Sequence, residues 1–418
     1  MATSSPALRC SIETRTVLGS SPIPLSAKSK ALFASLAGLW LCAALAYCAL
    51  REPFGFNYHI YKHFAVLANE GVDIFHQEGS LPNDTRDITV RYLDFTPAAL
   101  ALYRVLFFFS HRIYSLYQLL LAFASLGIVY QLYRLNHLNE FQWRCFFMVA
   151  VASPVWILVP IFEGEDKFIF ALCPLLLGFV RWRFPGPMYI YLLGLFIGLN
   201  AFPLLFVPIA VIDTMRLLRQ DPHARSLIPI ATCLLVGVCL TLLYFPDSTV
   251  MFANRAGREA QAPFWFSLWR ILPSSYNQYT HALALIGLCA LAYVRFYQGK
   301  QSFLESLIFI EFSFLMTGNY INFDRVNTIL VLPLVATQTK AFLKIYATVV
   351  FIIMHLMALF AVAHLFNNRI DSLFAVNVLI VNGCLVLYVS YLIYRSKGNA
   401  LERQENLRHR EPVGIDQG

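Results

Sequence analysis

The sequence predicts an all-α polytopic membrane protein, and three observations support this fold class. Of the 418 residues, 58% are hydrophobic and only 13% are charged, whereas soluble domains carry about 25% charged residues. Long apolar runs recur from residue 31 to residue 394, as expected of helices that cross roughly 30 Å of hydrocarbon. These runs do not alternate between apolar and polar residues as strands do, so helices are expected to satisfy the backbone groups within the membrane.

Composition also excludes several classes of function. The net charge of +8 is attributed to membrane topology rather than to a nucleic-acid partner, because basic residues of such proteins gather in cytoplasmic loops. The nine cysteines form no CxxC pair, and the long polar loops contain none, which excludes a disulfide framework and predicts no zinc site. The sequence contains no phosphate-binding P-loop, zinc-protease or serine-hydrolase motif.

The chain divides into two tails and one membrane domain. Residues 1–30, rich in Ser, Pro and Thr with scattered basic residues, are expected to form a cytoplasmic tail. The apolar run 31–50 lacks a clear small-x-small cleavage site, which favours a retained signal anchor over a cleaved signal peptide. The transmembrane domain is predicted to extend over 31–394, and the basic segment 395–418 is predicted to be a second cytoplasmic tail.

A cytoplasmic N-terminus places the polar stretch after the first span outside. Between residues 51 and 95 it carries seven acids and four Lys/Arg. The short apolar piece 97–110 either crosses the membrane or dips back as a re-entrant helix. The second alternative is preferred because it makes nearly every inner turn basic, and it gives about 12 membrane passes with both termini cytoplasmic. The predicted outer loops are 51–112, 163–167, 246–279 and 318–325.

Two other apolar runs are interrupted. Residues 188–213 contain a helix-breaking centre from Asn200 to Pro203, and they are expected to form a hairpin with both ends inside. Glu305 and Glu311 are six residues apart, which is about 240° around a helix. The two carboxylates are therefore not expected to share one face, as an ion path would prefer.

The first outer loop carries the largest set of candidate site residues. Asp94 is the preferred catalytic residue, because it lies in the segment YLDFTP, where the loop re-enters the membrane. Asp73 is a second candidate, and Asn57 and His59 are candidate substrate-binding residues. A carboxylate here could accept a proton from a sugar hydroxyl or bind a divalent cation bridged to phosphate. The competing interpretation is a solvated surface loop.

The second outer segment is the turn EGED at 163–166. Gly164 makes the turn, and Glu165 and Asp166 then open a helix. Acids are favoured at a helix N-terminus by the helix dipole, so a purely structural role competes with a role beside Asp94.

The third and fourth outer loops add charged residues. Arg255 and Arg258 are candidate phosphate ligands, because Lys and Arg are otherwise scarce outside. The nearby aromatic run 264–266 could stack on a sugar or anchor in the headgroup layer. Asp324 and Arg325 are adjacent at a helix start and are candidate substrate-binding residues, with a local ion pair as the alternative.

The order of these segments resembles the GT-C superfamily of membrane glycosyltransferases. The likeness is to the polyprenyl-phosphate-mannose-dependent α-mannosyltransferases and the GPI mannosyltransferases, and it covers roughly residues 31–340. The matching segments are Asn57-Tyr58-His59-Ile60-Tyr61, Gly71-Val72-Asp73-Ile74-Phe75, Phe95-Thr96-Pro97, Gly164-Glu165-Asp166, the segment 262–268 and Asn322-Phe323-Asp324-Arg325.

The resemblance implies a GT-C-like bundle that moves a sugar, with inversion, on the non-cytoplasmic face. It also implies a polyprenyl- or dolichyl-phosphate sugar as donor, a lipid or glycan acceptor, and contact with membrane lipids of a bacterial inner membrane or the endoplasmic reticulum. The loop aspartate of the family corresponds to Asn57, and an amide cannot act as a general base. Either Asp73, Asp94 or Asp166 has taken over this role, or the chain is a non-catalytic scaffold subunit. A polytopic transporter is a further alternative, although no internal repeat is visible.

Overall fold

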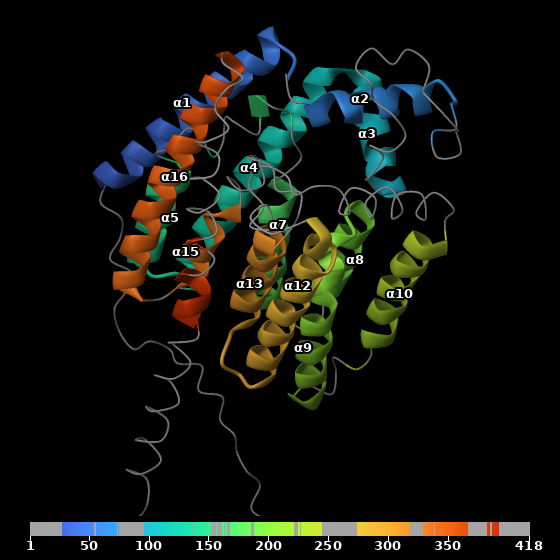
Figure 1. Ribbon diagram of the computed structural model, residues 1–418, viewed down its shortest axis with the longest axis vertical. Coiled ribbons are helices and arrows are strands. Elements are labelled where there is room, and N and C mark those ends of the chain that lie inside the picture. Colours follow the sequence, from blue (N-terminus) through green and yellow to red (C-terminus); the bar gives the residue numbers. More distant parts are fainter. Residues whose placement is uncertain are drawn as a thin grey trace, which may run out of the picture.

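The computed structural model is built from helices (Figure 1). The residues that the structure describes are 27–53, 56–72, 74, 96–135, 137–151, 156, 161–162, 164, 168–184, 188–220, 225, 227–244, 274–317, 329–337, 339–366, 383–384 and 387–392. No strand occurs within these ranges, which confirms the predicted all-α class.

The helices pack side by side, most of them with their axes roughly vertical in Figure 1. Their bounds are α1 (Ala27–Leu50), α2 (Phe56–Asn69), α3 (Pro97–Phe109), α4 (His111–Arg134), α5 (Glu140–Ala150), α7 (Phe168–Arg183), α8 (Tyr189–Leu199), η2 (Phe202–Phe206), α9 (Val207–Gln220), α10 (Ile228–Tyr244), α12 (Ser274–Tyr297), α13 (Phe303–Thr317), α15 (Leu332–Ala336) and α16 (Lys340–Phe366). Among the described residues, two stretches are long and apolar enough to cross a membrane, His111–Arg134 and Thr280–Tyr297.

The end of α1 and the start of α4 meet at one end of the molecule. Glu52 follows α1, and its Oε1 lies 3.3 Å from Nδ1 of His111, the first residue of α4. We call this end the upper end; α2 and α3 lie beside it (Figure 1). The segment between α1 and α4 therefore begins and finishes at the same end of the molecule.

The stretch interpreted from its composition as a polar loop contains an amphipathic helix, α2. Its buried face carries Tyr58, Tyr61 and Phe64, which recur at the helical spacing of three. The Tyr61 ring stacks on Tyr103 of α3 with a centroid distance of 4.8 Å. This aromatic contact packs α2 against α3 and explains why α2 forms in a segment rich in polar residues.

The break predicted between Asn200 and Pro203 is present. Helix α8 ends at Leu199, the Asn200 side chain accepts a hydrogen bond of 3.0 Å from the Phe202 N–H, and η2 then leads into α9. Thr96, the N-cap of α3, donates its hydroxyl to the Gly198 carbonyl at 2.6 Å. Because the last carbonyls of a helix have no intrahelical partner, this bond satisfies one of them and fixes the start of α3.

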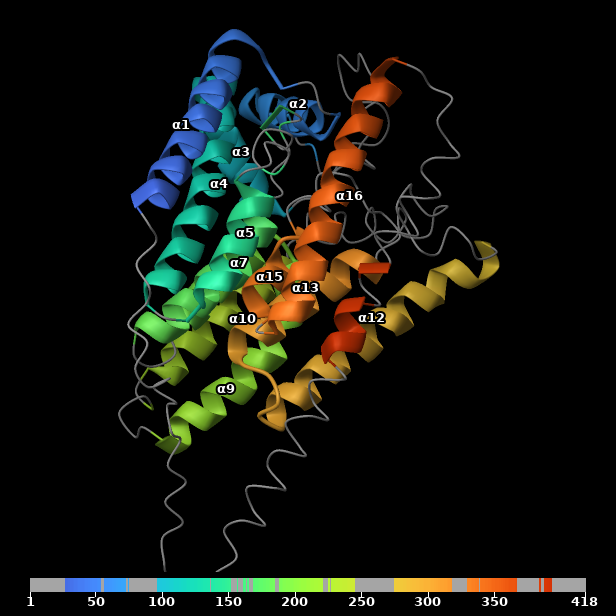
Figure 2. The same cartoon turned by 90° about the vertical axis from the view of Figure 1, so that its left-hand side faces the viewer.

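The two ends of this hairpin lie at the same end of the molecule, opposite the upper end, which we call the lower end. The Arg181 guanidinium of α7 binds the Asp213 carboxylate of α9 through Nε (2.5 Å) and Nη2 (3.1 Å). The Tyr189 hydroxyl at the start of α8 donates to the Ala210 carbonyl at 3.2 Å. The ion pair and this bond tie the end of α7 and the start of α8 to the middle of α9, which lies toward the bottom of Figure 2.

Helix α13 runs through the core, and its two glutamates have separate surroundings. Ser302 and Glu305 form a reciprocal cap, because the Ser302 N–H donates to Glu305 Oε2 at 2.8 Å and the Glu305 N–H donates to Ser302 Oγ at 3.3 Å. Glu311 is fully buried farther along the helix. The role of Glu305 is therefore that of a helix cap.

Gln142 joins the start of α5 to the end of α15. Its Nε2 donates to the carbonyls of Val335 (3.1 Å) and Thr337 (2.7 Å). Its Oε1 accepts from the Asn139 N–H at 2.9 Å, which completes a capping box at α5. One buried side chain thus satisfies main-chain groups of two helix ends far apart in the sequence.

Gln142→Leu is expected to lower the free energy of unfolding by about 2 kcal/mol, because it leaves buried carbonyls without donors. Gln118→Leu is the matched control: Gln118 is also buried, but its amide has no hydrogen-bond partner among the described residues. It should leave stability unchanged or raise it. Thermal unfolding in detergent measures both, and equal losses for the two variants would contradict this account.

Candidate functional site

Three ionisable side chains meet at the upper end, and we call them the Glu52 cluster: Glu52, Lys62 and His111. The Lys62 ammonium on α2 lies 2.9 Å from Oε2 and 3.1 Å from Oε1 of Glu52. His111 of α4 approaches the same carboxylate. The Lys62 and Glu52 side chains are 37% and 40% exposed, so a ligand in solvent or in a headgroup layer could reach them.

The cluster holds Glu52 in its ionised form. Partial burial opposes ionisation, but the ammonium of Lys62 and the rings of His111 and His59 outweigh it, so the pKa of the Glu52 carboxyl is lowered from its ordinary value of 4.5. A carboxylate with a lowered pKa is a weak general base at neutral pH. The chemistry that suits this cluster is the binding of a charged group rather than proton abstraction.

Tyr58 lies beneath the cluster and is fully buried. Burial, and then the charge of Glu52, raise the pKa of its phenol, so it stays neutral at physiological pH. Its ring centroid is 5.6 Å from that of Tyr114 and 6.0 Å from the Lys62 ammonium. The aromatic rings therefore give the cluster an apolar floor.

The Gly164 turn packs directly on this floor. Gly164 has φ +71°, and a Cβ there would lie 2.6 Å from Cβ of Pro53 and 2.8 Å from Cβ of Tyr58. The Tyr114 hydroxyl donates to the Gly164 carbonyl at 2.8 Å. The turn predicted at Gly164 is thus present, and it joins the second predicted outer segment to the first.

Two of the predicted site residues lie in described structure. His59 is on α2, partly buried, and its ring centroid is 5.3 Å from that of Tyr58. Asn57 is in the first turn of the same helix. The predicted site residues that lie outside the described residues are Asp73, Asp94, Glu165, Asp166, Arg255, Arg258, Asp324 and Arg325.

The sequence offers Glu52 as one of several acids in the first outer loop, but it does not connect Glu52 with Lys62 or His111. Glu52 follows a span, Lys62 lies within α2 and His111 begins α4, so three separate elements contribute to it. No local spacing connects them. The helical period of α2 could have indicated one contact of the cluster, because it places Lys62 one turn from Tyr58, the tyrosine beneath the cluster.

Within the described residues, no group of three or more His, Cys, Asp or Glu side chains is placed to hold a metal ion. Neither a protein-family model, nor a curated protein, nor a solved structure matches this chain. The function of the chain is therefore inferred from its geometry and from its sequence motifs.

Gly164→Ala is expected to destabilise the protein more than Gly71→Ala. Both glycines have positive φ, +71° and +85°, which costs an L-residue roughly 1–2 kcal/mol. A Cβ at Gly71 meets nothing within 4 Å, whereas a Cβ at Gly164 overlaps Pro53 and Tyr58, which adds about 1–3 kcal/mol. Melting temperatures of both variants measure the difference, and equal shifts would show that the turn does not pack on the cluster.

The contribution of Glu52 to stability should depend on pH. Glu52→Gln is expected to lower the free energy of unfolding at neutral pH by less than about 1 kcal/mol, because the ion pair is exposed. Since the folded pKa is lowered, this contribution is present above the ordinary value of 4.5 and is lost as the pH falls through the folded value.

Thermal unfolding of wild type and Glu52→Gln at about pH 7 and about pH 3 checks this expectation. Lys62→Met should have little further effect in the Glu52→Gln background, because its partner is already neutral. A difference between wild type and Glu52→Gln that is the same at both pH values would contradict the assignment.

Proposed function

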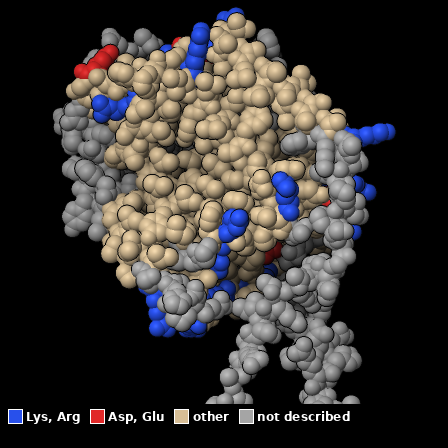
Figure 3. All heavy atoms as spheres, turned by 180° about the vertical axis from the view of Figure 1, so that it is seen from behind, with Lys and Arg blue, Asp and Glu red and all other residues tan. Residues whose placement is uncertain are grey.

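We propose that the chain is a polytopic membrane protein whose upper end faces the non-cytoplasmic side. Support comes from the apolar surface of its helices. Among the described side chains of α10, Ala231 alone is buried, whereas Ile230 and Leu234 are 55% and 48% exposed. On α12, Leu283 and Ile286 are 66% and 64% exposed. Soluble monomers rarely expose contiguous apolar surface of this extent, and Figure 3 shows one face on which a broad area carries no Lys, Arg, Asp or Glu.

The basic residues support the orientation. Helices α4, α7, α9 and α12 end at the lower end, and each has arginine in its last turn: Arg134, Arg181 and Arg183, Arg219, and Arg295. Because Lys and Arg concentrate on the cytoplasmic side, the lower end is assigned to the cytoplasm. About 12 passes and cytoplasmic termini are proposed on the same rule. The compartment, a bacterial inner membrane or the endoplasmic reticulum, is proposed from the family resemblance.

We further propose that the upper end transfers a sugar from a polyprenyl- or dolichyl-phosphate donor to a lipid or glycan acceptor. The observation that carries this proposal is the contact between two outer segments, in which the Gly164 turn packs on Tyr58 below the Glu52 cluster. Both segments belong to the GT-C-like motif order. A donor whose lipid chain lies in the bilayer would present its phosphate at this level, where Lys62 offers a cation.

The catalytic base in this proposal is not Glu52, because Lys62 keeps its pKa low. The role is assigned to Asp94 or Asp166, with Asp73 as the third candidate. Residues proposed to bind the donor or the acceptor are Asn57, His59, Glu165, Arg255, Arg258, Asp324 and Arg325. A divalent cation could join a carboxylate to the donor phosphate.

A non-catalytic scaffold subunit is the second candidate function. The observation that favours it is that Asn57 stands where the family has an aspartate, while the nearby described carboxylate, Glu52, is paired with Lys62. In a scaffold the same upper end would bind a lipid-linked sugar or a catalytic partner without removing a proton. The two candidates therefore differ in turnover rather than in ligand class.

Purified protein in nanodiscs, supplied with radiolabelled polyprenyl- and dolichyl-phosphate sugars and a lipid acceptor extract, tests the enzyme. Asp94→Asn or Asp166→Asn is expected to lower the rate about 10²–10⁴-fold, as loss of a general base does. Glu70→Gln, an exposed acid after α2 in the same outer stretch, is the matched control and should retain activity.

Wild-type binding of donor without turnover would favour the scaffold over the enzyme. Full activity in both aspartate variants would exclude the assignment of the base to Asp94 or Asp166. Equal loss in the Glu70→Gln control would show that the measured effect reflects the charge of the loop rather than catalysis.

A further inference from the structure

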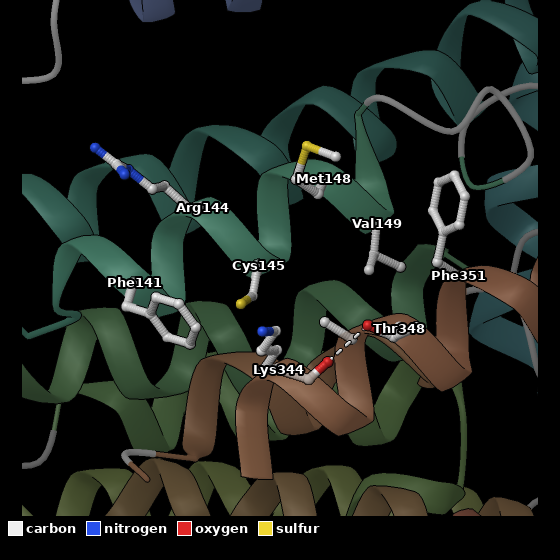
Figure 4. A pocket seen from close by; sticks show the side chains of 9 residues that line it. Phe141, Arg144, Cys145, Met148, Val149, Lys344, Thr348 and Phe351 are labelled. Atoms are coloured by element: carbon white, nitrogen blue, oxygen red, sulfur yellow. Dashed lines mark hydrogen bonds between the residues drawn. The ribbon is translucent and has the colours of Figure 1, made fainter. Parts of the chain in front are cut away.

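A groove lies between α5 and α16 and has a volume of about 450 Å³ (Figure 4). Its walls carry two cations, Arg144 and Lys344, and several apolar side chains, including Met148, Val149 and Phe351. The predicted outer segments do not contribute to its lining.

The two cations share one end of the groove. Helix α5 begins at Glu140 and helix α16 begins at Lys340, so Arg144 and Lys344 are each the fifth residue of their helix. Figure 4 shows Arg144 and Lys344 on opposite walls in one half of the groove, with Phe141 beside them, and Val149 and Phe351 in the other half. The groove is therefore amphipathic along its length.

The charged end has a net positive balance. Arg144 pairs with Glu140, while Lys344 and the neighbouring Lys340 are exposed. The two cations of the lining, with Lys340 at the start of α16, outnumber the one carboxylate paired there, Glu140. The N-termini of the two helices add partial positive charge at the same end, so an anion is favoured there.

The apolar end opens on the surface that we assign to the membrane. Met148, Ile345 and Ile352 around the groove are 55%, 57% and 50% exposed. From Lys344 to Phe351 the wall of α16 extends about 10 Å. An occupant with an anionic head and an apolar chain matches both the charge and the shape.

We propose that this groove binds an anionic phospholipid of the cytoplasmic leaflet, with its phosphate between Arg144 and Lys344 and an acyl chain along Met148, Val149 and Phe351. The proposal depends on the membrane orientation proposed above, but not on glycosyl transfer. The groove has its cations at the lower end, whereas the Glu52 cluster lies at the upper end. The sugar donor is accordingly assigned to the Glu52 cluster, and a structural phospholipid to the groove.

Native mass spectrometry of the delipidated full chain in detergent, titrated with phosphatidylglycerol or phosphatidylcholine of the same acyl chains, tests the proposal. Phosphatidylglycerol is expected to bind more tightly. Arg144→Gln/Lys344→Gln should weaken phosphatidylglycerol about 25-fold, at about fivefold per cation, and leave phosphatidylcholine unchanged. The matched control is Arg183→Gln/Lys300→Gln, which removes one exposed arginine and one exposed lysine outside the groove.

A third variant separates the groove from its charge. Thr348 lines the groove and is exposed, so Thr348→Trp should block the acyl chain while both cations remain. Loss of phosphatidylglycerol binding is expected, with an unchanged melting temperature as the check on folding. Ala347→Leu fills the same wall with a smaller side chain and serves if Thr348→Trp unfolds early.

Two outcomes of the binding experiments would overturn the proposal: equal weakening by the groove and control double variants, or wild-type binding in both groove-filling variants. Phosphatidylglycerol binding in a protein that transfers no sugar would support the groove while contradicting the enzyme. A chain that stays monodisperse in water without detergent would contradict the membrane orientation, and with it this inference.

Discussion

Side chains that donate hydrogen bonds to unpaired main-chain carbonyls hold the helix ends of this protein together. Many of its helices are short or broken, and every break leaves carbonyls without an intrahelical partner. In apolar surroundings such groups are costly unless another donor reaches them. Donors from distant helices do so: Trp40 Nε1 binds the Val151 carbonyl at 2.7 Å, Tyr293 the Leu205 carbonyl at 2.8 Å, Arg295 the Leu392 carbonyl at 2.6 Å and Tyr346 the Leu330 carbonyl at 3.0 Å.

The same constraint shapes the candidate site. The Gly164 turn is held by the Tyr114 hydroxyl, and the Glu52 backbone carbonyl accepts from Tyr47 at 3.1 Å. Tyr114 belongs to α4 and Tyr47 belongs to α1. Because tyrosine side chains are rigid, these hydrogen bonds hold the Gly164 turn and the segment after α1 in fixed positions. At the other end, Gln142 fixes the start of α5, one wall of the groove.

Local sequence could predict the elements whose limits depend on local chemistry. The apolar piece 97–110 corresponds to α3, the break from Asn200 to Pro203 is present, and Gly164 has the positive φ that its turn requires. These features depend on the positions of Pro and Gly and on the lengths of apolar runs. All of these can be read directly from the local sequence.

Features made by tertiary contact could not be predicted in this way. Helix α2 was overlooked because its polar composition masked the spacing of its buried tyrosines. The pairings of Glu52 with Lys62 and of Arg181 with Asp213 join separate elements, so no spacing indicates them. The sequence indicates acids by their position at predicted loop boundaries. In the described part of the chain, the acid at the upper end is paired with Lys62 and contacts His111.

Those basic partners restrict where a catalytic base could act. Cations lower the pKa of a carboxyl and apolar burial raises it, so a useful base must lie away from Lys62 and His111. Thr96, two residues after Asp94 in the sequence, is buried at the apolar end of α8. The base proposed for sugar transfer would need apolar surroundings to keep its proton affinity near neutral pH, and Glu52 lacks them. The lowered pKa of Glu52 thus separates two roles within the proposed function: the Glu52 cluster suits the binding of a phosphate, and proton transfer falls to an acid outside the cluster.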